Sequence, residues 1–386
     1  MTPQPHDLER ALARGELLFH YQPKVSFLTG RIAGAEALIR WNHPDGPTVR
    51  AADFMPAAAA SGLGAEITRQ MFPRLVEDLR SIRECRGDTH VAFNVAADDL
   101  GDAALVGMIR HAISDDALDA GCLEIEVTEG TEVQETPAVA RSLTGLLAAG
   151  VSLSMDDYGI GFSSLEALSR LPFSVLKMDQ SFVLRMLSSP KSATLVKTSI
   201  ATAHLLGLRT VVEGIERQDV YRALLHYGCD EGQGYWLSPP LPLEEYVAFL
   251  RSDPRWPSSP IGMLRMAQLT HTWQLKLLFD LIHGYLKSPE STTGVPPGLH
   301  IGHDQCALGL WFNGSGRALA GDPAFDGLEA PHHALHDLCG ELVASMEQPD
   351  GRRRVRELLV ELSERASELG AALQRLETKL LLADLD

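Results

Sequence analysis

The sequence predicts an α/β domain built on parallel strands, followed by an all-α domain. Short apolar runs alternate with longer helical patterns up to about residue 250, which is typical of βαβ units. Three prolines and three serines then interrupt the pattern at residues 251–260, as in many linkers. Beyond this segment the pattern is almost wholly helical, with one glycine-rich interruption at about 288–327. We therefore expect domains at 1–257 and 258–386.

Composition limits the class of protein. The chain has 386 residues, 45% of them hydrophobic, and a formal charge of −17. The acidic balance argues against a nucleic acid polymer as partner, because no basic stripe is available for phosphates. The start MTPQPHD lacks the positive n-region and apolar h-region that are typical of a signal peptide, and no run approaches the roughly 18 apolar residues that a membrane helix needs. Five scattered cysteines fit a reducing compartment, so we expect a cytoplasmic protein without membrane insertion.

The expected strands of the first domain share one feature, a polar residue at or near the carboxyl end. These strands are VAFNV (91–95), CLEIEVTE (122–129), VSLSMDD (151–157), FSVLKMD (173–179) and RTVVEGI (209–215). The polar residues are Asn94, Glu126, Glu129, Asp156, Asp157, Lys177, Asp179 and Glu213. In parallel α/β barrels such ends meet at one face, where the active site lies. Glu36 joins them if AGAEALIR (33–40) is a strand of the same sheet.

Convergence of these side chains would place several carboxylates close together with only Lys177 to offset them. The carboxylates are Glu36, Glu126, Asp156, Asp157 and Glu213. They would repel one another unless divalent cations lay between them, and Glu, Asp and Asn ligands suit Mg²⁺ or Mn²⁺ better than zinc. Two such ions are a common arrangement for in-line displacement at phosphorus. For any one of these residues, a simpler role is a charge that faces water or caps a helix.

Eight segments in order support a specific family resemblance. They are YQP (21–23), EALIRW (36–41), NVA (94–96), EVTE (126–129), DDYGIGFSS (156–164), KMD (177–179), EGIE (213–216) and GCDEGQGYWLSPP (228–240). Over roughly residues 8–250 the sequence resembles the EAL family of cyclic di-GMP phosphodiesterases. The resemblance implies a TIM-like (β/α) barrel that hydrolyses cyclic di-GMP to linear 5′-pGpG with two Mg²⁺ or Mn²⁺ ions.

The same resemblance implies roles for individual residues. The metal ligands would be Glu36, Asn94, Glu126 and Asp156, with Asp157 serving the second ion. Lys177 resembles the residue that holds the attacking water, and Glu213 its acidic partner near the metals. The substrate-binding positions would be Gln22, Arg40, Asp179 and Gln233, and the anchor of the DDYGIGFSS loop would be Glu129. The sequence departs from the family pattern at Ala59, Ile160 and Phe162, which concerns dimer coupling or loop closure more than chemistry.

A second group of candidate ligands lies beyond residue 258. His271 shares a helical stripe with apolar residues and should point into a bundle, and His332 and His336 are one turn apart. His333 falls on another face and is the poorer ligand. One inward-facing histidine is usually a core residue, but three histidines with Cys306 form a set that zinc accepts in a tetrahedron.

The motifs HTWQLKLL (271–278), DQCALGLW (304–311) and PHHALH (331–336) make this part similar to the chemoreceptor zinc-binding (CZB) family, a four-helix bundle, over about residues 262–386. The resemblance implies one zinc ion on His271, Cys306, His332 and His336. Cys339, one turn beyond His336, is an additional thiol that could compete as a ligand.

The last helix carries an apolar stripe with alternating steps of four and three. Its members are Val355, Leu359, Leu362, Ala366, Leu369, Leu373, Leu376 and Leu380. Such a stripe predicts bundle core, and a dimer seam is the alternative. We expect a homodimer.

Three hypotheses follow for the function. The first is a cyclic di-GMP phosphodiesterase whose activity is regulated by zinc binding to the bundle. The second is a catalytically weak or inactive receptor for cyclic di-GMP; the complete set of metal-ligand residues argues against it. In the third, the bundle merely dimerises and its His/Cys set is incidental.

Overall fold

A computed structural model of the chain describes residues 5–114, 118–119, 121–128, 136–158, 168, 170–288, 302–348 and 350–383. The chain divides into two compact units. The first comprises Met1–Val196, Leu208–Arg222 and Asp230–Pro257. The second comprises Lys197–Gly207, Ala223–Cys229 and Ser258–Asp386. The second unit thus resumes near the expected seam and also takes in two segments of the preceding sequence.

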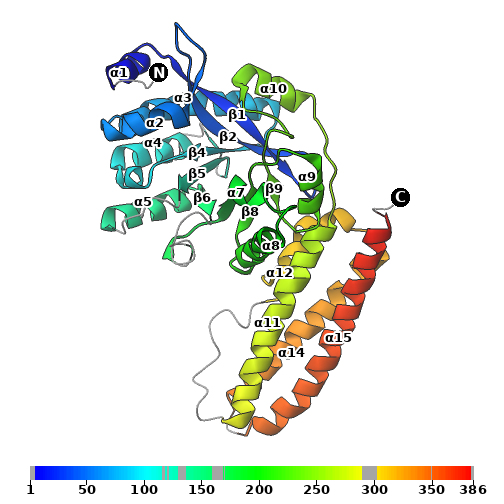
Figure 1. The fold of residues 1–386 in the computed structure, drawn as a ribbon. Coiled ribbons are helices and arrows are strands. Elements are labelled where there is room, and N and C mark those ends of the chain that lie inside the picture. The colour runs from blue at the N-terminus through cyan, green and yellow to red at the C-terminus, as the bar shows by residue number, and fades with distance from the viewer. Residues whose placement is uncertain are drawn as a thin grey trace. The chain divides into compact units, whose positions relative to one another are not determined.

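Eight strands of the first unit form a closed barrel (Figure 1). They are β1 (Leu17–Ser26), β2 (Ile32–Trp41), β4 (His90–Asn94), β5 (Leu123–Thr128), β6 (Ser152–Tyr158), β7 (Val175–Met178), β8 (Arg209–Val212) and β9 (Glu231–Gly232). From β2 through β4 to β9 each neighbouring pair is parallel, whereas β1 is antiparallel to both β2 and β9 and closes the barrel between them. Two short strands, β3 (Val49–Arg50) and β10 (Leu241–Pro242), pair with β2 and β1.

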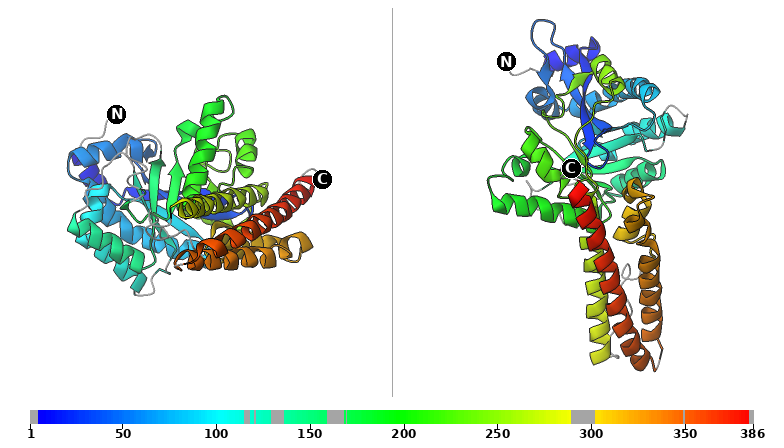
Figure 2. Two further views of the ribbon diagram at one scale, coloured as in Figure 1. Left: turned by 90° about the horizontal axis from the view of Figure 1, so that it is seen from below. Right: turned by 90° about the vertical axis from the view of Figure 1, so that its right-hand side faces the viewer.

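Helices cover the outside of this barrel (Figures 1 and 2). Those within the first unit are α1 (Pro5–Ala13), α2 (Ala51–Ala60), α3 (Gly64–Cys85), η1 (Ala97–Gly101), α4 (Ala103–Ser114), α5 (Pro137–Ala148), α7 (Gln180–Val183) and α10 (Leu243–Arg251). Helices α8 (Pro190–Leu205) and α9 (Gln218–Leu225) are divided between the two units. The long helix α3 illustrates why they pack: Ile67, Met71, Leu75, Leu79 and Ile82 recur at helical spacing and are buried against the strands, leaving the polar face outside.

The predicted strands are confirmed, including AGAEALIR as part of β2. All five apolar runs are parallel strands, and their ends agree within two residues, except that β8 ends at Val212, three residues before the end of RTVVEGI. The register places Asn94 of β4 opposite Glu126 of β5, and Thr128 of β5 opposite Asp156 of β6. Because parallel strands end at the same edge, this register brings the polar carboxyl ends together.

Beyond residue 258 the second unit is helical. Its helices are α11 (Ile261–Lys287), α12 (Ala307–Asn313), η3 (Ser315–Leu319), α13 (Pro323–Asp326), α14 (Glu329–Met346) and α15 (Arg352–Ala383). The long helices α11, α14 and α15 lie side by side (Figures 1 and 2). Within the described residues the fourth bundle member is α12, which has only seven residues and lies inside the expected interruption. None of the described helices combines the length and apolarity needed to cross a membrane.

The stripe on α15 lies in the core of this unit. Five of its members, Val355, Leu362, Leu369, Leu373 and Leu376, are buried, and Leu359, Ala366 and Leu380 pack against them. This confirms the interpretation of the stripe as bundle core. Leu358, which lies outside the stripe, is buried as well.

Candidate functional site

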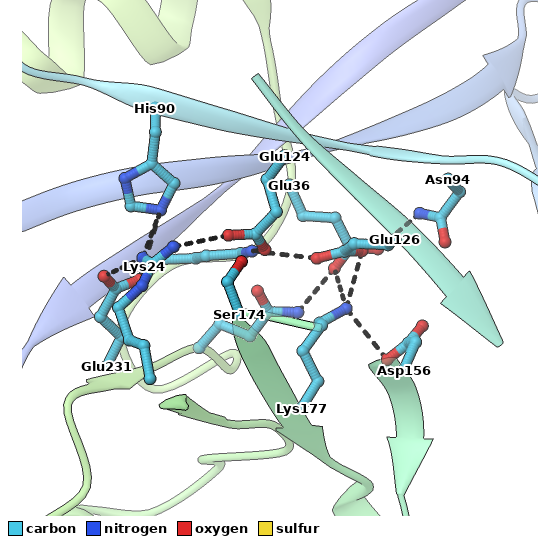
Figure 3. A network of polar contacts seen from close by, with 12 residues as sticks. Lys24, Glu36, His90, Asn94, Glu124, Glu126, Asp156, Ser174, Lys177 and Glu231 are labelled. Atoms are coloured by element: carbon cyan, nitrogen blue, oxygen red, sulfur yellow. Dashed lines mark hydrogen bonds and ion pairs between the residues drawn. The ribbon is translucent and has the colours of Figure 1, made fainter. Parts of the chain in front are cut away.

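The candidate active site lies at the carboxyl ends of the barrel strands (Figure 3). Strands β2, β4, β5, β6 and β7 supply Glu36, Asn94, Glu126, Asp156 and Lys177. Glu213 directly follows β8 and Gln233 directly follows β9. On each strand every second residue points to the same side. These side chains lie on the side that faces the barrel interior.

Lys177 is the centre of this site. Its Nζ lies 2.7 Å from Glu213 Oε1, 2.8 Å from Glu126 Oε2, 3.1 Å from Asp156 Oδ1 and 3.4 Å from Glu36 Oε2. The lysine is fully buried, and burial alone would lower its pKa. The surrounding carboxylates outweigh that effect and raise the pKa well above the ordinary value, so Lys177 is an ammonium ion at any physiological pH.

Glu36 is held in place by two amides. Asn94 Nδ2 donates to its Oε1 at 2.9 Å, and Gln233 Nε2 donates to its Oε2 at 2.7 Å. The Gln233 Oε1 atom is buried and has no hydrogen-bond partner among the described residues. An unsatisfied buried carbonyl oxygen of this kind is unfavourable unless a water, a ligand or a cation contacts it.

The remaining carboxylates are difficult to ionise together. Burial, followed by the charge of Glu36, raises the pKa of Glu126 well above its ordinary value. Burial raises the pKa of Glu213 to about 8, and burial together with Asp156 raises that of Asp157 to about 6. Asp157 also has a backbone φ of 60°, a conformation that few non-glycine residues adopt.

The donor set fits divalent cations. When ionised, Glu36, Glu126, Asp156, Asp157 and Glu213 exceed the charge of Lys177 by four negative charges, the charge that two divalent ions neutralise. The oxygen-only chemistry of these side chains matches Mg²⁺ or Mn²⁺. Asn94, whose Nδ2 donates to Glu36, adds an amide oxygen to the oxygen donors at this site.

A cavity of about 1080 Å³ opens above these residues. Its lining includes three of the four predicted substrate-binding residues, Gln22, Arg40 and Gln233. The fourth, Asp179, does not line it; its Oδ1 accepts a hydrogen bond from the Ser181 amide at 2.8 Å and caps α7. Glu126 and Lys177 are fully buried and are not part of the lining.

Three further sequence expectations concern the cavity or its surroundings. Ala59, a departure from the family pattern, lines the cavity. Glu129 and the loop positions Ile160 and Phe162 lie outside the described residues. Asp99 and Thr68 also line the cavity and were not anticipated, because neither lies at the end of a predicted strand.

A buried charge network that was not anticipated from the sequence lies below the site. Lys24 contacts both Glu124 and Glu126, and Arg209 contacts both Glu124 and Glu231. The available signal was a lysine at the second inward-facing position of YQPKV and two glutamates at alternate positions of LEIEV.

The second candidate site lies in the helical unit. His271 of α11, Cys306 before α12, and His332 and His336 of α14 bring their ligand atoms within 4.8 Å of one another. Cys306 Sγ and His332 Nε2 are 3.1 Å apart. The Sγ atom also accepts a hydrogen bond from the Gly309 amide at 3.2 Å, so the start of α12 fixes the position of the thiol.

The chemistry of this His/Cys group suits a soft or borderline cation. Burial lowers the pKa of His271 to about 4 and that of His332 to about 3, which keeps both rings neutral near pH 7. Both ring nitrogens of His271 are buried without a hydrogen-bond partner in the described structure. Burial raises the pKa of the Cys306 thiol. Neutral imidazoles and one cysteine form a donor set that zinc accepts.

Two neighbouring residues do not belong to this group. His333 instead lies against His303, with ring centroids 3.7 Å apart, as expected from its position on another face of the helix. Cys339 is buried and close enough to Cys306 for the two thiols to interact electrostatically; burial is the main cause that raises its pKa to about 12.

Comparisons with known proteins agree with the barrel and its motifs. A family model described as "EAL domain" matches residues 6–240. MucR of Pseudomonas aeruginosa, named a bifunctional diguanylate cyclase/cyclic di-GMP phosphodiesterase, is 36% identical over 63% of this chain. RocR of the same organism, named a cyclic di-GMP phosphodiesterase, is 32% identical over 64% of the chain. The alignments span 36% of MucR and 63% of RocR.

Solved structures give the same result. A phosphodiesterase structure titled as PaMucR in complex with c-di-GMP is 36% identical, with a TM-score of 0.57 over 62% of this chain and 98% of its own. An EAL domain protein from Listeria monocytogenes is 28% identical, with a TM-score of 0.57 over 64% of this chain and 98% of its own. Since the family model covers more than half of the residues, the chain belongs to the EAL domain family.

Proposed function

We propose that the chain hydrolyses cyclic di-GMP to linear 5′-pGpG with two Mg²⁺ or Mn²⁺ ions. The observation that carries the proposal is the contact of Lys177 with four carboxylates beneath a cavity of about 1080 Å³. The names of the relatives MucR, NbdA and RocR include the same phosphodiesterase activity, which supports the assignment of substrate.

In this proposal Glu36, Asn94, Glu126, Asp156 and Asp157 hold the ions. The bound ions would neutralise charge on the phosphodiester and make a water easier to deprotonate. Lys177 orients the attacking water, and Glu213, whose Oε1 lies 2.7 Å from the Lys177 Nζ, takes up a proton in its ionised form. Water adds to one phosphorus and the 3′ oxygen leaves, so one phosphodiester bond is opened.

Four residues would hold the nucleotide. Arg40 lines the cavity, and a guanidinium can donate two parallel hydrogen bonds to a phosphate. Gln22 and Gln233 present amides at the same cavity. Asp179 would act through its neighbours, because its side chain caps the start of α7.

We further propose that residues 258–386 form a CZB-like domain in which His271, Cys306, His332 and His336 bind one regulatory zinc ion. The support is the clustering of four ligand atoms within 4.8 Å and the two unpartnered nitrogens of His271. Zinc can regulate the barrel only if it binds two states of the chain with different affinity. A homodimer joined through this domain is one arrangement that would provide two such states.

One assay tests activity, metal requirement and regulation together. Purified chain is incubated with cyclic di-GMP and Mg²⁺, with or without a zinc-selective chelator, and 5′-pGpG is measured by chromatography. We expect a linear product that requires Mg²⁺ and a rate that changes when zinc is removed. Tight nucleotide binding without product under every zinc condition would favour the receptor alternative. An unchanged rate in a Cys306→Ala variant, with no zinc in the purified protein, would favour a bundle that only dimerises.

A further inference from the structure

The network below the active site reaches the proposed metal ligands through Glu126. Lys24 of β1 is fully buried and lies one inward-facing position below Gln22. Its Nζ is 2.9 Å from Glu126 Oε1 and 2.9 Å from Glu124 Oε1 (Figure 3). Buried charges are retained only where they are paired, so the three side chains depend on one another for their positions.

Cations and carboxylates alternate along this network. Lys177 contacts Glu126 Oε2 at 2.8 Å, and Lys24 contacts the other oxygen of the same carboxylate. Glu124 repeats the pattern, since Lys24 contacts its Oε1 and Arg209 contacts its Oε2 at 2.7 Å. Each of these two carboxylates is therefore held at both oxygens by a different cation.

This arrangement restricts how Glu126 can bind a metal ion. Rotation of the carboxylate about its last bond would break the Lys24 contact at Oε1. Only Oε2 faces the group that contains Glu36 and Asp156, where Lys177 also lies. Glu126 therefore offers an ion in this group its Oε2 atom in a fixed position, because Lys24 holds Oε1.

We propose that Lys24 is a positioning residue that fixes Glu126 as a one-oxygen ligand and so increases the affinity of the site for its divalent ions. This inference rests on the proposed metal site of the barrel. Without Lys24, Oε1 is released, and Glu126 can turn both oxygens toward Lys177. Residues behind a metal ligand commonly change metal affinity by about 10- to 100-fold.

The test is direct titration with Mn²⁺, followed by the electron paramagnetic resonance signal of the free ion, without nucleotide. Lys24→Met keeps the length of the side chain and removes its charge. We expect its Mn²⁺ dissociation constant to rise by about 10-fold or more. In the hydrolysis assay the half-saturating Mn²⁺ concentration should rise by the same factor, with a much smaller change in kcat at saturating metal.

Glu124→Gln is the matched control. Glu124 lies on the same strand, is equally buried and contacts the same Nζ, but its replacement leaves the Lys24 to Glu126 contact intact. A general loss of packing would weaken Mn²⁺ binding in both variants, whereas positioning by Lys24 predicts that Glu124→Gln stays within about twofold of the wild type. If Lys24→Met does not fold, the double variant Lys24→Met/Glu124→Met removes the buried pair together and should show the same loss of affinity.

Two results with the variants would overturn the inference: wild-type Mn²⁺ affinity in Lys24→Met, or equal losses in Lys24→Met and Glu124→Gln. Both are independent of hydrolysis. A wild-type chain that binds Mn²⁺ but forms no 5′-pGpG would contradict the proposed activity and leave the titration decisive for Lys24. A wild-type chain that binds no Mn²⁺ would overturn the metal site and the role of Lys24 together.

Discussion

Asp157 combines two unfavourable features at one position. Its backbone has a φ of 60°, and burial together with the charge of Asp156 raises its pKa to about 6. Strain and like-charge repulsion of this kind persist at functional sites because a bound ligand offsets them. Asp157 is therefore one of the residues that destabilise the metal-free site, together with Glu126 and Glu213.

This predicts how stability and metal binding depend on pH. Between about pH 4 and pH 6 the unfolded chain has lost the Asp157 proton while the folded chain keeps it, so this residue makes the metal-free fold less stable as the pH rises. Bound Mn²⁺ reverses the effect, because it favours the ionised carboxylates. The Mn²⁺-induced increase in melting temperature should thus be larger at pH 8 than at pH 6, measured by differential scanning fluorimetry.

The Asp157→Asn variant tests the effect of this charge in the same measurement. Asparagine tolerates positive φ and carries no charge, so the metal-free variant should be more stable than the wild type at pH 8 by about 1 kcal/mol, a value reduced for solvent screening. Its Mn²⁺-induced shift should shrink. Asp45→Asn, at an exposed loop position, should change neither quantity. A metal-free Asp157→Asn variant that is less stable than the wild type would contradict this account.

Single residues were predictable from the sequence where a motif marked them. The residues at the strand ends come together at the Lys177 site, because a parallel sheet places those ends at one edge. Lys24 and Arg209 were not anticipated, since a charge inside an apolar run has no periodic signal and only the closed barrel shows which carboxylate it meets. Asp99 was likewise not anticipated, because its place in the cavity wall depends on how η1 follows β4.

At the scale of elements, α11 contains one glycine with closely packed surroundings and one with open space around it. A Cβ on Gly262 would lie 2.3 Å from the Leu225 carbonyl oxygen and 2.7 Å from the Gly228 amide nitrogen, all within the second unit. A Cβ on Gly284 would meet nothing within 4 Å, and this residue is exposed. Close backbone approach therefore explains the first glycine but not the second.

Alanine substitutions should separate the two positions. Gly284→Ala should stabilise the chain by about 0.5–1 kcal/mol, because alanine has the higher helix propensity. Gly262→Ala should destabilise it by about 1–3 kcal/mol, because the helix must shift away from Leu225. Urea unfolding followed by circular dichroism at 222 nm measures both. Equal effects of the two substitutions would show that the Gly262 contact does not limit packing.

Elements were predicted well where periodicity was long. The apolar stripe of α15 follows from a repeat that extends over many residues, and the short strands of the barrel follow from the alternation of apolar runs with helical patterns. The short helix α12 was hidden in a glycine-rich stretch, because seven residues give too few turns for a pattern. Its position matters for the second site, since the helix begins directly after Cys306 and its Gly309 amide donates to the thiol.

At the scale of the whole molecule, the chain combines two sites in two units with separate hydrophobic cores. The sequence indicated both sites but contains no pattern that describes energetic coupling, because coupling depends on the relative free energies of two states of the whole chain. Regulation by zinc therefore requires a measurement of binding at both sites rather than at either one alone.

The reciprocal coupling of two binding equilibria provides that measurement. If zinc changes the affinity for cyclic di-GMP by some factor, the nucleotide must change the affinity for zinc by the same factor. Glu213→Gln, expected to bind nucleotide with little hydrolysis, allows both dissociation constants to be measured by isothermal titration calorimetry in the presence of Mg²⁺. We expect equal factors of about 5 or more, and loss of both effects when Cys306→Ser is added, since that substitution removes the thiolate ligand of the zinc site. A factor of one in both titrations, with zinc still bound, would show that the helical unit binds zinc without changing the affinity of the barrel for the nucleotide.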